Sequence, residues 1–596
     1  MNKRTTMQPR LTANGLLMVL LACWWLLNVV QAAFTELAND ESYYWFFAWH
    51  LDWGYYDHPP MTPLLIWLGS WLPGELGVRL CVTLLQPLYL YLLWMMIRPS
   101  DATRRDAWLY FLVAFSIPLM QLYGFVATPD APLMMFSVLF LFCFQRFCKK
   151  DSIPHALLLG VSIALLAYSK YHGALVVLLT LAAYPRCFKS PRIYLAGIVF
   201  AVLYLPHLLW QYHHDWASFQ YHLMGRNSSF RMEYASNFVL NAILVFNPLF
   251  VYHYIKGWNH DDRHCPEPLR RAMLFIVAGF LGFFLLSSMR GPTQPQWIIP
   301  ATIGLIWILF DYARQHERSR RYVRTVGLVC VALFLAARLL VMWNPFHWAG
   351  ELWDNRENNR QIAAMANGRP VIFPNDYTAA TKYIFYTGGG RLTPAACARQ
   401  LDDRTPQPKS CGEAFAQPLL YTRTSQWEYT RYDDLFAGRD IIVQRLPSME
   451  SKEDFSRDPT MTLANGRTFY YREVPAFRPL RRIGIRLSEP LDSITSAADS
   501  IRLSLVVTNP YPYPIVSTAE RPVWIQFYME QNPNDFRSSC HYLDTVIPAH
   551  DSLRLRYTFA VPQSLDHRRY TTQIAIRDSL LLPWRNSEVF KVNYVK

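Results

Sequence analysis

Apolar residues gather into runs that recur from Leu16 to about Trp343, and polar residues separate them. A helix needs about 20 apolar residues to cross a bilayer. The pattern therefore predicts spans near 14–33, 76–97, 107–126, 131–147, 155–169, 174–184, 193–210, 236–256, 271–288, 296–312 and 325–343. The fifth and sixth runs are short, so they form either two full spans or a half-buried pair.

The pattern changes after the last apolar run, where the chain turns polar and stays polar. Residues 345–475 mix short strand-like stretches such as PVIFP with helical ones such as DYTAATKYIFY, which indicates an α/β region. Residues 476–596 alternate apolar and polar positions between turns, as in IRLSLVVTN, which favours a β-sandwich. We expect a polytopic helical membrane domain at 1–344, followed by these two soluble regions.

Composition supports a membrane protein, because 52% of the residues are hydrophobic and only 17% are charged. The net charge of +14 would also suit nucleic acid. However, Lys and Arg gather in the N-terminus and in every second loop, which is the distribution expected of cytoplasmic loops. This argues against a nucleic-acid partner. It also predicts that residues 345–596 are extracytoplasmic. The first apolar run is long for the core of a signal peptide and the chain beyond it stays in the membrane, so we expect a retained signal anchor rather than a cleaved signal peptide.

The other loops have a different composition, which makes them the expected place for chemistry. They lie at 34–75, 127–132, 169–173, 211–234 and 289–297, and they are rich in Asp, His, Trp, Tyr and Pro. The stretch NDESYYWFFAWHLDWGYYDHPP, residues 39–60, joins acids to many aromatic rings. Such rings suit a helix that lies at the membrane interface. A carboxylate there can meet both a membrane-embedded molecule and the water layer.

Five residues of these loops are candidates for acid–base or binding chemistry, and each also has a structural explanation. Asp40 and Glu41 either act as a base or stabilise the first turn of a helix. Asp57 with His58, and Asp130, precede or adjoin prolines, where an acid also caps a helix. Repetition of acid-bearing turns on one membrane face favours the chemical interpretation.

The cationic candidates lie on the same face. Lys170 and His172 separate two short apolar runs, where an ionisable residue is a functional candidate or reaches toward the interface. Arg226 suits phosphate binding or contact with lipid headgroups. Arg290 and Trp297 share a short loop that either binds substrate or packs.

Six segments occur here in a recognisable order: NDESYYW, GYYDHPPM, ATPDAPL, YSKYHGAL, LLWQYHHDWASFQYHLMGR and QPQWIIPA. Together they resemble bacterial membrane glycosyltransferases of the protein O-mannosyltransferase and aminoarabinose transferase superfamily, which has the GT-C fold. The resemblance covers about residues 12–345. It implies a multi-pass protein of the bacterial inner membrane that takes its sugar from a polyprenyl-phosphate-linked donor.

The resemblance also implies roles for individual residues. Asp40 matches the first-loop acid taken as the general base, with Glu41 beside it, and Asp130 matches the second-loop acid. Asp57 and His58 match a position before two prolines that differs among branches. The aminoarabinose transferases carry lysine where this chain has His58, so the sugar is left open.

We therefore expect an enzyme that transfers a sugar to a hydroxyl of a lipid, glycan or protein on the outer face of the membrane, with inversion. Direct attack needs a base at the acceptor and cations at the leaving phosphate, which Arg226, Lys170, His172 and Arg290 can supply. One divalent cation on the acidic face, and a disulfide between Cys397 and Cys411, are left open. The alternatives are a transporter or flippase of lipid-linked sugars, for which the chain lacks an internal repeat, and an inactive scaffold.

Overall fold

The computed structural model covers the whole chain. It describes residues 12–49, 51–214, 216, 218–219, 222, 231–260, 264–348, 350–369, 371–373, 377–388, 400–401, 407–408, 415–416, 438–445, 459–480, 482–495, 500–519, 521–532, 535–561, 569–578, 584–585, 587–588 and 590–595. These residues form two compact units, 1–360 with 381–396 and 361–380 with 397–596. The expected boundaries at 344 and 475 stay a prediction.

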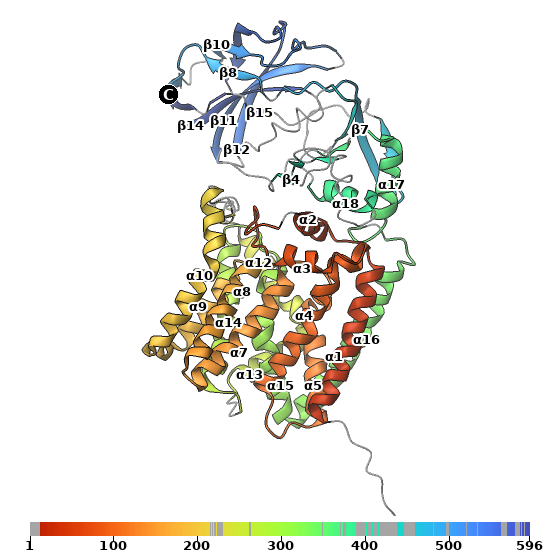
Figure 1. The fold of residues 1–596 in the computed structure, drawn as a ribbon, viewed down its shortest axis with the longest axis vertical. Helices are drawn as coiled ribbons and strands as arrows, with labels where there is room; N and C mark the ends of the chain where they lie inside the picture. Colours follow the sequence, from red (N-terminus) through yellow and green to blue (C-terminus); the bar gives the residue numbers. More distant parts are fainter. Residues whose placement is uncertain are drawn as a thin grey trace, which may run out of the picture. The chain divides into compact units, whose positions relative to one another are not determined.

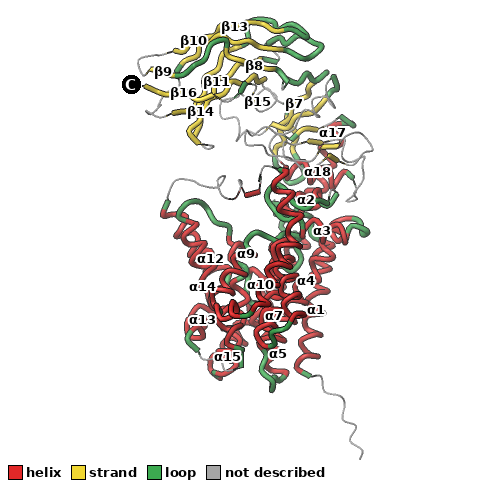
Figure 2. The backbone as a smooth tube through the Cα atoms, turned by 60° about the vertical axis from the view of Figure 1, so that its left-hand side comes forward, coloured by secondary structure: helices red, strands yellow, loops and turns green. Residues whose placement is uncertain are grey.

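The first unit is helical (Figures 1 and 2). Its longer helices are α1 (Ala13–Phe34), α4 (Gly74–Ile97), α5 (Arg104–Phe115), α7 (Asp130–Lys149), α8 (Ile153–Ser169), α9 (Gly173–Ala183), α10 (Pro191–His213), α12 (Met232–Val245), α13 (Val251–Trp258), α14 (Glu267–Ser288), α15 (Ala301–Gln315) and α16 (Glu317–Trp343). Short helices lie between them at α2 (Asn39–Phe47), α3 (Met61–Gly69) and α6 (Leu119–Leu122), with η1 (Pro185–Lys189), η2 (Pro248–Phe250) and η3 (Pro295–Ile298).

The structure supports part of the expected count of about eleven spans. Within the described residues, six helices are long and apolar enough to cross a membrane: α1, α4, α7, α10, α14 and α16. A seventh span exists if α12 and α13, bent by 80°, count as one. The other predicted ranges hold shorter helices, α5, α8, α9 and α15, of 12, 17, 11 and 15 residues. The chain is nevertheless a multi-pass membrane protein with a largely helical N-terminal region.

Side chains form hydrogen bonds with backbone groups where the predicted spans at 107–126 and 236–256 are interrupted. Asn247 lies at the bend between α12 and α13 with a positive φ of 72°, and it is 3% exposed. Its amide nitrogen donates to the carbonyl oxygen of Ser116, at the end of α5 (2.9 Å), and its amide oxygen accepts the N–H of Leu249 (3.1 Å). An irregular backbone is tolerated at membrane depth when protein groups satisfy it in this way.

The loops of the helical unit sort into two groups at opposite ends. Ion pairs join three basic loops around α5, α13 and α15, as Arg314 with Asp101 (3.1 Å) and His260 with Asp311 (3.8 Å) show. Helices α2 and α3 lie at the other end (Figures 1 and 2). The acid-bearing loops meet there, as described below. The hydropathy pattern thus predicted the sorting of the loops, and the assignment of ends to compartments stays a prediction.

The second unit is rich in β-structure. One mixed sheet has the strand order β2-β1-β5-β7-β6 and a second pairs only β3 with β4. Their strands are β1 (Val371–Ile372), β2 (Gln400–Leu401), β3 (Gln407–Pro408), β4 (Phe415–Ala416), β5 (Ile441–Arg445), β6 (Thr460–Thr462) and β7 (Thr468–Val474). Two helices, α17 (Asn355–Ala366) and α18 (Tyr377–Thr387), each belong partly to both units.

Two further sheets enclose one apolar core from Leu480 to Val592. Their orders are β13-β10-β8 and β12-β11-β14-β16-β9, with β15 beside β14. The strands are β8 (Gly484–Leu487), β9 (Ser493–Thr495), β10 (Ser500–Thr508), β11 (Val523–Asn532), β12 (Asp535–Tyr542), β13 (Ser552–Ala560), β14 (Arg569–Asp578), β15 (Trp584–Arg585) and β16 (Phe590–Val595). This arrangement is a β-sandwich, as the alternating pattern predicted.

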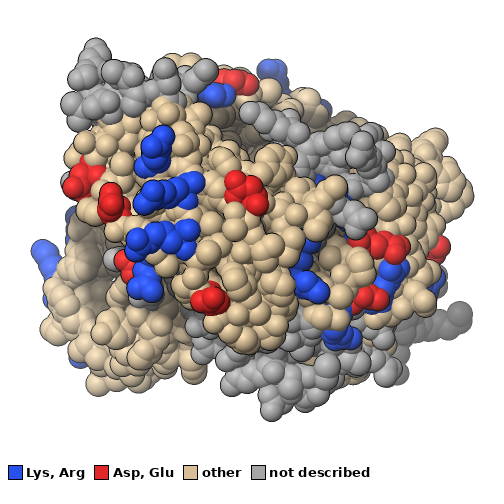
Figure 3. Space-filling view, turned by 90° about the horizontal axis from the view of Figure 1, so that it is seen from above, with Lys and Arg blue, Asp and Glu red and all other residues tan. Residues whose placement is uncertain are grey.

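The outward face of the smaller sheet is basic. Leu503, Leu505 and Leu555 point into the core, so the alternate residues of β10 and β13 point away from it. Exposed arginines occupy those positions and the matching one on β8: Arg486, Arg502, Arg554 and Arg556. Basic side chains form a row on the face of the molecule shown in Figure 3. These arginines contribute to the positive net charge, but they are not part of the basic loops that predict the membrane topology.

Candidate active site

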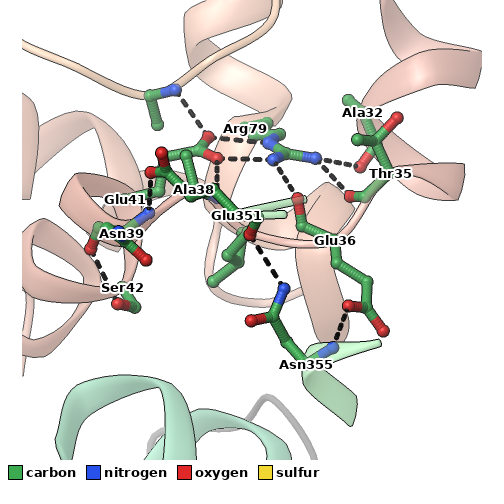
Figure 4. Close-up of polar contacts among 12 residues, drawn as sticks. Ala32, Thr35, Glu36, Ala38, Asn39, Glu41, Ser42, Arg79, Glu351 and Asn355 are labelled. Atoms are coloured by element: carbon green, nitrogen blue, oxygen red, sulfur yellow. Dashed lines mark hydrogen bonds and ion pairs between the residues drawn. The ribbon is translucent and has the colours of Figure 1, made fainter. Parts of the chain in front are cut away.

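The first acid-bearing loop forms α2, whose start is fixed by the buried ion pair between Glu41 and Arg79. The Arg79 guanidinium donates Nε–H to Glu41 Oε1 (2.7 Å) and Nη2–H to Oε2 (2.5 Å). The backbone N–H groups of Ala127 and Ala38 donate to the same two oxygens, at 2.7 and 2.9 Å. Neither charged side chain is exposed. Glu41 is therefore fully engaged with protein groups (Figure 4).

Arg79 uses all its donors. Its remaining N–H groups reach the carbonyl oxygens of Ala32 (3.1 Å), Thr35 (2.6 Å) and Glu36 (2.9 Å), at the end of α1. An arginine has five N–H donors, and each has an acceptor here. One side chain of α4 thus fastens the end of α1 to the beginning of α2.

Asp40 is placed differently from its neighbour, because adjacent residues of a helix point about 100° apart. Asp40 is exposed, whereas Glu41 is buried. Although the residue has solvent contact, the surrounding protein atoms partly desolvate its carboxyl group, and this raises the pKa of Asp40. The charges of His58 and Lys170 lower it, and those of Asp57 and Glu351 raise it. Solvent contact limits the size of these effects. Asp40 is the carboxylate of α2 that faces outward.

Asp57 and His58 form a half-buried pair next to α2. His58 Nδ1 lies 3.1 Å from Asp57 Oδ2, and it also lies 3.3 Å from the hydroxyl of Tyr44. The hydroxyl of Tyr43 donates to Asp57 Oδ1 (3.4 Å), and His222 Nε2 donates to the Asp57 carbonyl oxygen (2.8 Å). Burial alone would raise the pKa of Asp57, but the two histidines together hold it below its ordinary value.

Helix α10 holds the loop that carries this pair. The indole N–H of Trp210 donates to Asp52 Oδ2 (2.9 Å), and His207 Nδ1 donates to the carbonyl oxygen of Trp53 (2.6 Å). The ring of Trp210 lies where a Cβ at Gly54 would come within 2.5 Å of it, so only glycine fits there. The position of Asp57 therefore depends on a helix about 150 residues later in the chain.

Asp130 and Lys170 form a second buried ion pair. Lys170 Nζ donates to Asp130 Oδ1 at 2.7 Å, and the exposed fractions of the two side chains are 7% and 4%. Asp130 is the first residue of α7, and Lys170 directly follows α8. The charge of Lys170 also acts on Asp40. Together with His222, which contacts Asp57, the structure thus brings together residues from four of the predicted loops.

The remaining predicted residues lie in different surroundings. The ring of His172 packs against those of Phe284 (5.1 Å between centroids) and Trp297 (5.7 Å). The Trp297 indole N–H donates to the Gln294 side chain (3.0 Å). Arg290 is exposed, on the turn after α14. Arg226, Cys397 and Cys411 lie outside the described residues.

Two buried arginines were not among the residues that the sequence predicted for the site. Arg79 holds Glu41, and Arg338 of α16 donates to the side chains of Gln31 and Asn28 on α1. Both are at most 5% exposed. Each is a lone arginine within a predicted apolar span, and this is the signal that would have identified them. The described residues include no group of three or more His, Cys, Asp or Glu placed to hold a metal ion, and a divalent cation stays an open prediction.

Comparison with known proteins shows which families and structures this chain resembles. The family described as Dolichyl-phosphate-mannose-protein mannosyltransferase matches residues 57–210, which include Asp57, His58, Asp130 and Lys170. The lipid A galacturonosyltransferase RgtD of Rhizobium johnstonii (strain DSM 114642 / LMG 32736 / 3841) is 25% identical over 413 residues, which is 64% of this chain and 83% of that protein.

Solved structures show the same fold. The crystal structure of ArnT from Cupriavidus metallidurans in the apo state has a TM-score of 0.53 at 14% identity, and the match covers 77% of this chain and 98% of that one. The structure of the same protein bound to undecaprenyl phosphate gives 0.52 at 15% identity, over 76% and 97% of the two chains. The similarity favours an enzyme over a transporter or a scaffold. The chain is thus similar to membrane glycosyltransferases: residues 57–210 match the Dolichyl-phosphate-mannose-protein mannosyltransferase family, and the chain shares the fold of ArnT.

Proposed function

We propose that this enzyme transfers a sugar from a polyprenyl-phosphate-linked donor to an acceptor hydroxyl, with inversion, on the outer face of a bacterial inner membrane. The undecaprenyl phosphate bound by the ArnT structure supports the donor class. The name of the Rhizobium relative supports a lipid A-type glycolipid as the first acceptor to test. The clustering of acidic and basic side chains at the α2 end supports the location of the reaction.

One observation carries the assignment of the base: Asp40 is exposed next to Glu41, whose oxygens are both engaged. A general base needs a lone pair within hydrogen-bond reach of the hydroxyl that it deprotonates. Asp40 offers this, and its raised pKa makes it a stronger base than an ordinary aspartate. We therefore assign catalysis to Asp40 and positioning to Glu41.

The reaction is balanced as a single displacement. Asp40 accepts the proton of the acceptor hydroxyl while the hydroxyl oxygen forms a bond to C1 of the sugar. The bond from C1 to the phosphate oxygen breaks, and polyprenyl phosphate leaves with the electron pair. Because the attack comes from the side opposite the leaving group, the configuration at C1 inverts.

The leaving phosphate requires cations, and Lys170 is the described cation that best meets this need. It is buried, and it approaches Asp40 closely enough for its charge to act there. Its ammonium group has three N–H donors, of which Asp130 takes one. Arg226, His172 and Arg290 remain further candidates. Asp57, His58 and Trp297 are proposed to line the site and bind the sugar or the acceptor.

The function is tested with the purified full chain in nanodiscs, a set of synthetic polyprenyl-phosphate sugars, and lipid A as acceptor. The product's anomeric configuration is read by NMR. Asp40→Asn keeps the shape of the side chain and its ability to stabilise a helix start, but it cannot take a proton. We expect a loss of about 10²-fold or more in kcat, with donor binding retained.

Two results would overturn parts of the proposal. Full activity of Asp40→Asn would exclude this residue as the base and direct attention to Asp57. A product with retained configuration would exclude the single displacement. If lipid A accepts no sugar from any donor, the acceptor is sought by comparing envelope lipids and glycoproteins of cells with and without the gene.

A further inference from the structure

Two helix starts exchange their capping groups at the base of the proposed site. Helix α2 begins at Asn39, and its N-cap residue Ala38 has no side-chain oxygen to accept a hydrogen bond. The Asn39 N–H instead donates to Glu351 Oε1, at 2.5 Å, from the chain beyond the last membrane helix. In return, Glu36 accepts the N–H groups of Asn355 (2.6 Å) and Arg356 (3.1 Å) at the start of α17. Figure 4 shows both ends of this exchange.

Further contacts from the same stretch of chain hold α2. The hydroxyl of Tyr386 accepts the N–H of Leu37 (2.8 Å), and the hydroxyls of Thr381 and Ser42 are 2.9 Å apart. Lys382 donates to the carbonyl oxygen of Glu351 (2.8 Å), which fixes the backbone that carries this carboxylate. The segment after α16 is therefore built to hold Glu351 against α2.

We propose that Glu351 is a positioning residue for Asp40: it fixes the first turn of α2 through Asn39 and places a negative charge close to the base. The inference rests on the proposed role of Asp40. It gives the chain after the membrane helices a role in the reaction. Neither the hydropathy pattern nor the six segments that resemble the glycosyltransferase family indicate such a role.

The two parts of this role follow from simple electrostatics. Anions stabilise the start of a helix because its free N–H groups carry partial positive charge. A second negative charge near a carboxylate makes its ionised form less favourable. Burial is the largest influence that raises the pKa of Asp40, and Glu351 and Asp57 add to it while His58 and Lys170 oppose it. Other described titratable groups lie at this end. Tyr123 is near both Asp40 and Asp130, Glu41 is paired with Arg79, Glu36 caps α17, and His222 contacts Asp57.

Two substitutions separate position from charge. Glu351→Gln keeps an oxygen that can accept the Asn39 N–H but removes the charge. We expect kcat at its plateau to change by less than about twofold, and the acid limb of the kcat/KM profile to move to lower pH, because the pKa of Asp40 falls. Glu351→Ala removes the acceptor as well. We expect kcat to fall about fivefold with donor KM unchanged. This is the decrease in the population of correctly placed α2 that corresponds to the free energy of a lost helix cap.

Glu357→Gln is the matched control. Glu357 is an exposed acid of α17 that pairs with Arg360 (3.8 Å), and its substitution removes one negative charge six residues after Glu351 in the chain. The control should keep the wild-type pH profile. An acid limb that does not move in Glu351→Gln overturns the electrostatic role, and a wild-type kcat in Glu351→Ala overturns the positioning role.

The outcome for Asp40→Asn separates the two proposals. If Asp40→Asn is inactive and both Glu351 variants behave as wild type, only the inference about Glu351 fails. If Asp40→Asn is fully active, the proposed base itself is wrong, whatever the Glu351 variants do.

Discussion

Removing Arg79 should destabilise the whole first unit. This side chain pairs with the buried Glu41 carboxylate at the start of α2, and it also donates to the carbonyl groups at the end of α1. Arg79→Met deletes five hydrogen bonds and leaves Glu41 fully buried with two backbone N–H donors. Breaking a buried ion pair by removing one partner costs about 3–5 kcal/mol. Since folded proteins are stable by about 5–15 kcal/mol, this is a large fraction of the total.

A double-mutant cycle tests the origin of that cost. Glu41→Gln should also be costly, because its amide has one acceptor oxygen where Glu41 accepts four hydrogen bonds. The double variant Arg79→Met/Glu41→Gln removes both charges of this pair, so neither is left buried without its partner. We therefore expect it to lose clearly less stability than the sum of the two single variants.

The measurement is thermal denaturation of the purified proteins in one detergent, followed by tryptophan fluorescence and by the fraction that stays monodisperse. Arg321→Met is a suitable control, since its pairing with Glu317 is exposed on α16. Stability losses that add within about 0.5 kcal/mol in the double variant would refute the reasoning, because the pair would then contribute no coupling energy.

The predicted topology is tested by fusing a reporter that is active only in the periplasm to Lys596, where it should be active. Activity of a second reporter that works only in the cytoplasm, fused at the same residue, would exclude the outer-face assignment. Arg226→Ala should lower kcat/KM for the donor by about tenfold, because a hydrogen bond to the phosphate is lost, and the acceptor KM should not change. Unchanged donor kinetics would mean that Arg226 contacts only lipid headgroups. The acid limb of kcat/KM should lie above the ordinary pKa of aspartate, because burial raises the pKa of Asp40 and the base must be deprotonated; in Asp40→Asn this limb should disappear from the residual activity.

The sequence alone determined the elements and their arrangement along the chain. Every predicted apolar range contains helix, and the alternating stretches after Leu480 form the strands of a sandwich. Both patterns are local: a helix and a strand place side chains with periods that can be read from neighbouring residues. The basic loops could be recognised for the same reason. Helix length could not, since the breaks after Ser116 and at Asn247 depend on side chains that meet across the fold.

The candidate site was only partly visible in the sequence. The pattern nominated Asp40 and Glu41 together, because both stand in the first turn of one helix and no local feature separates them. The tertiary structure distinguishes them: Arg79, 38 residues later, takes Glu41 into the interior and leaves Asp40 exposed. Glu351, more than 300 residues away, then reaches the same helix start. Such contacts join distant parts of the chain, so folding alone decides which of two adjacent carboxylates holds the site together and which one is free to meet a substrate.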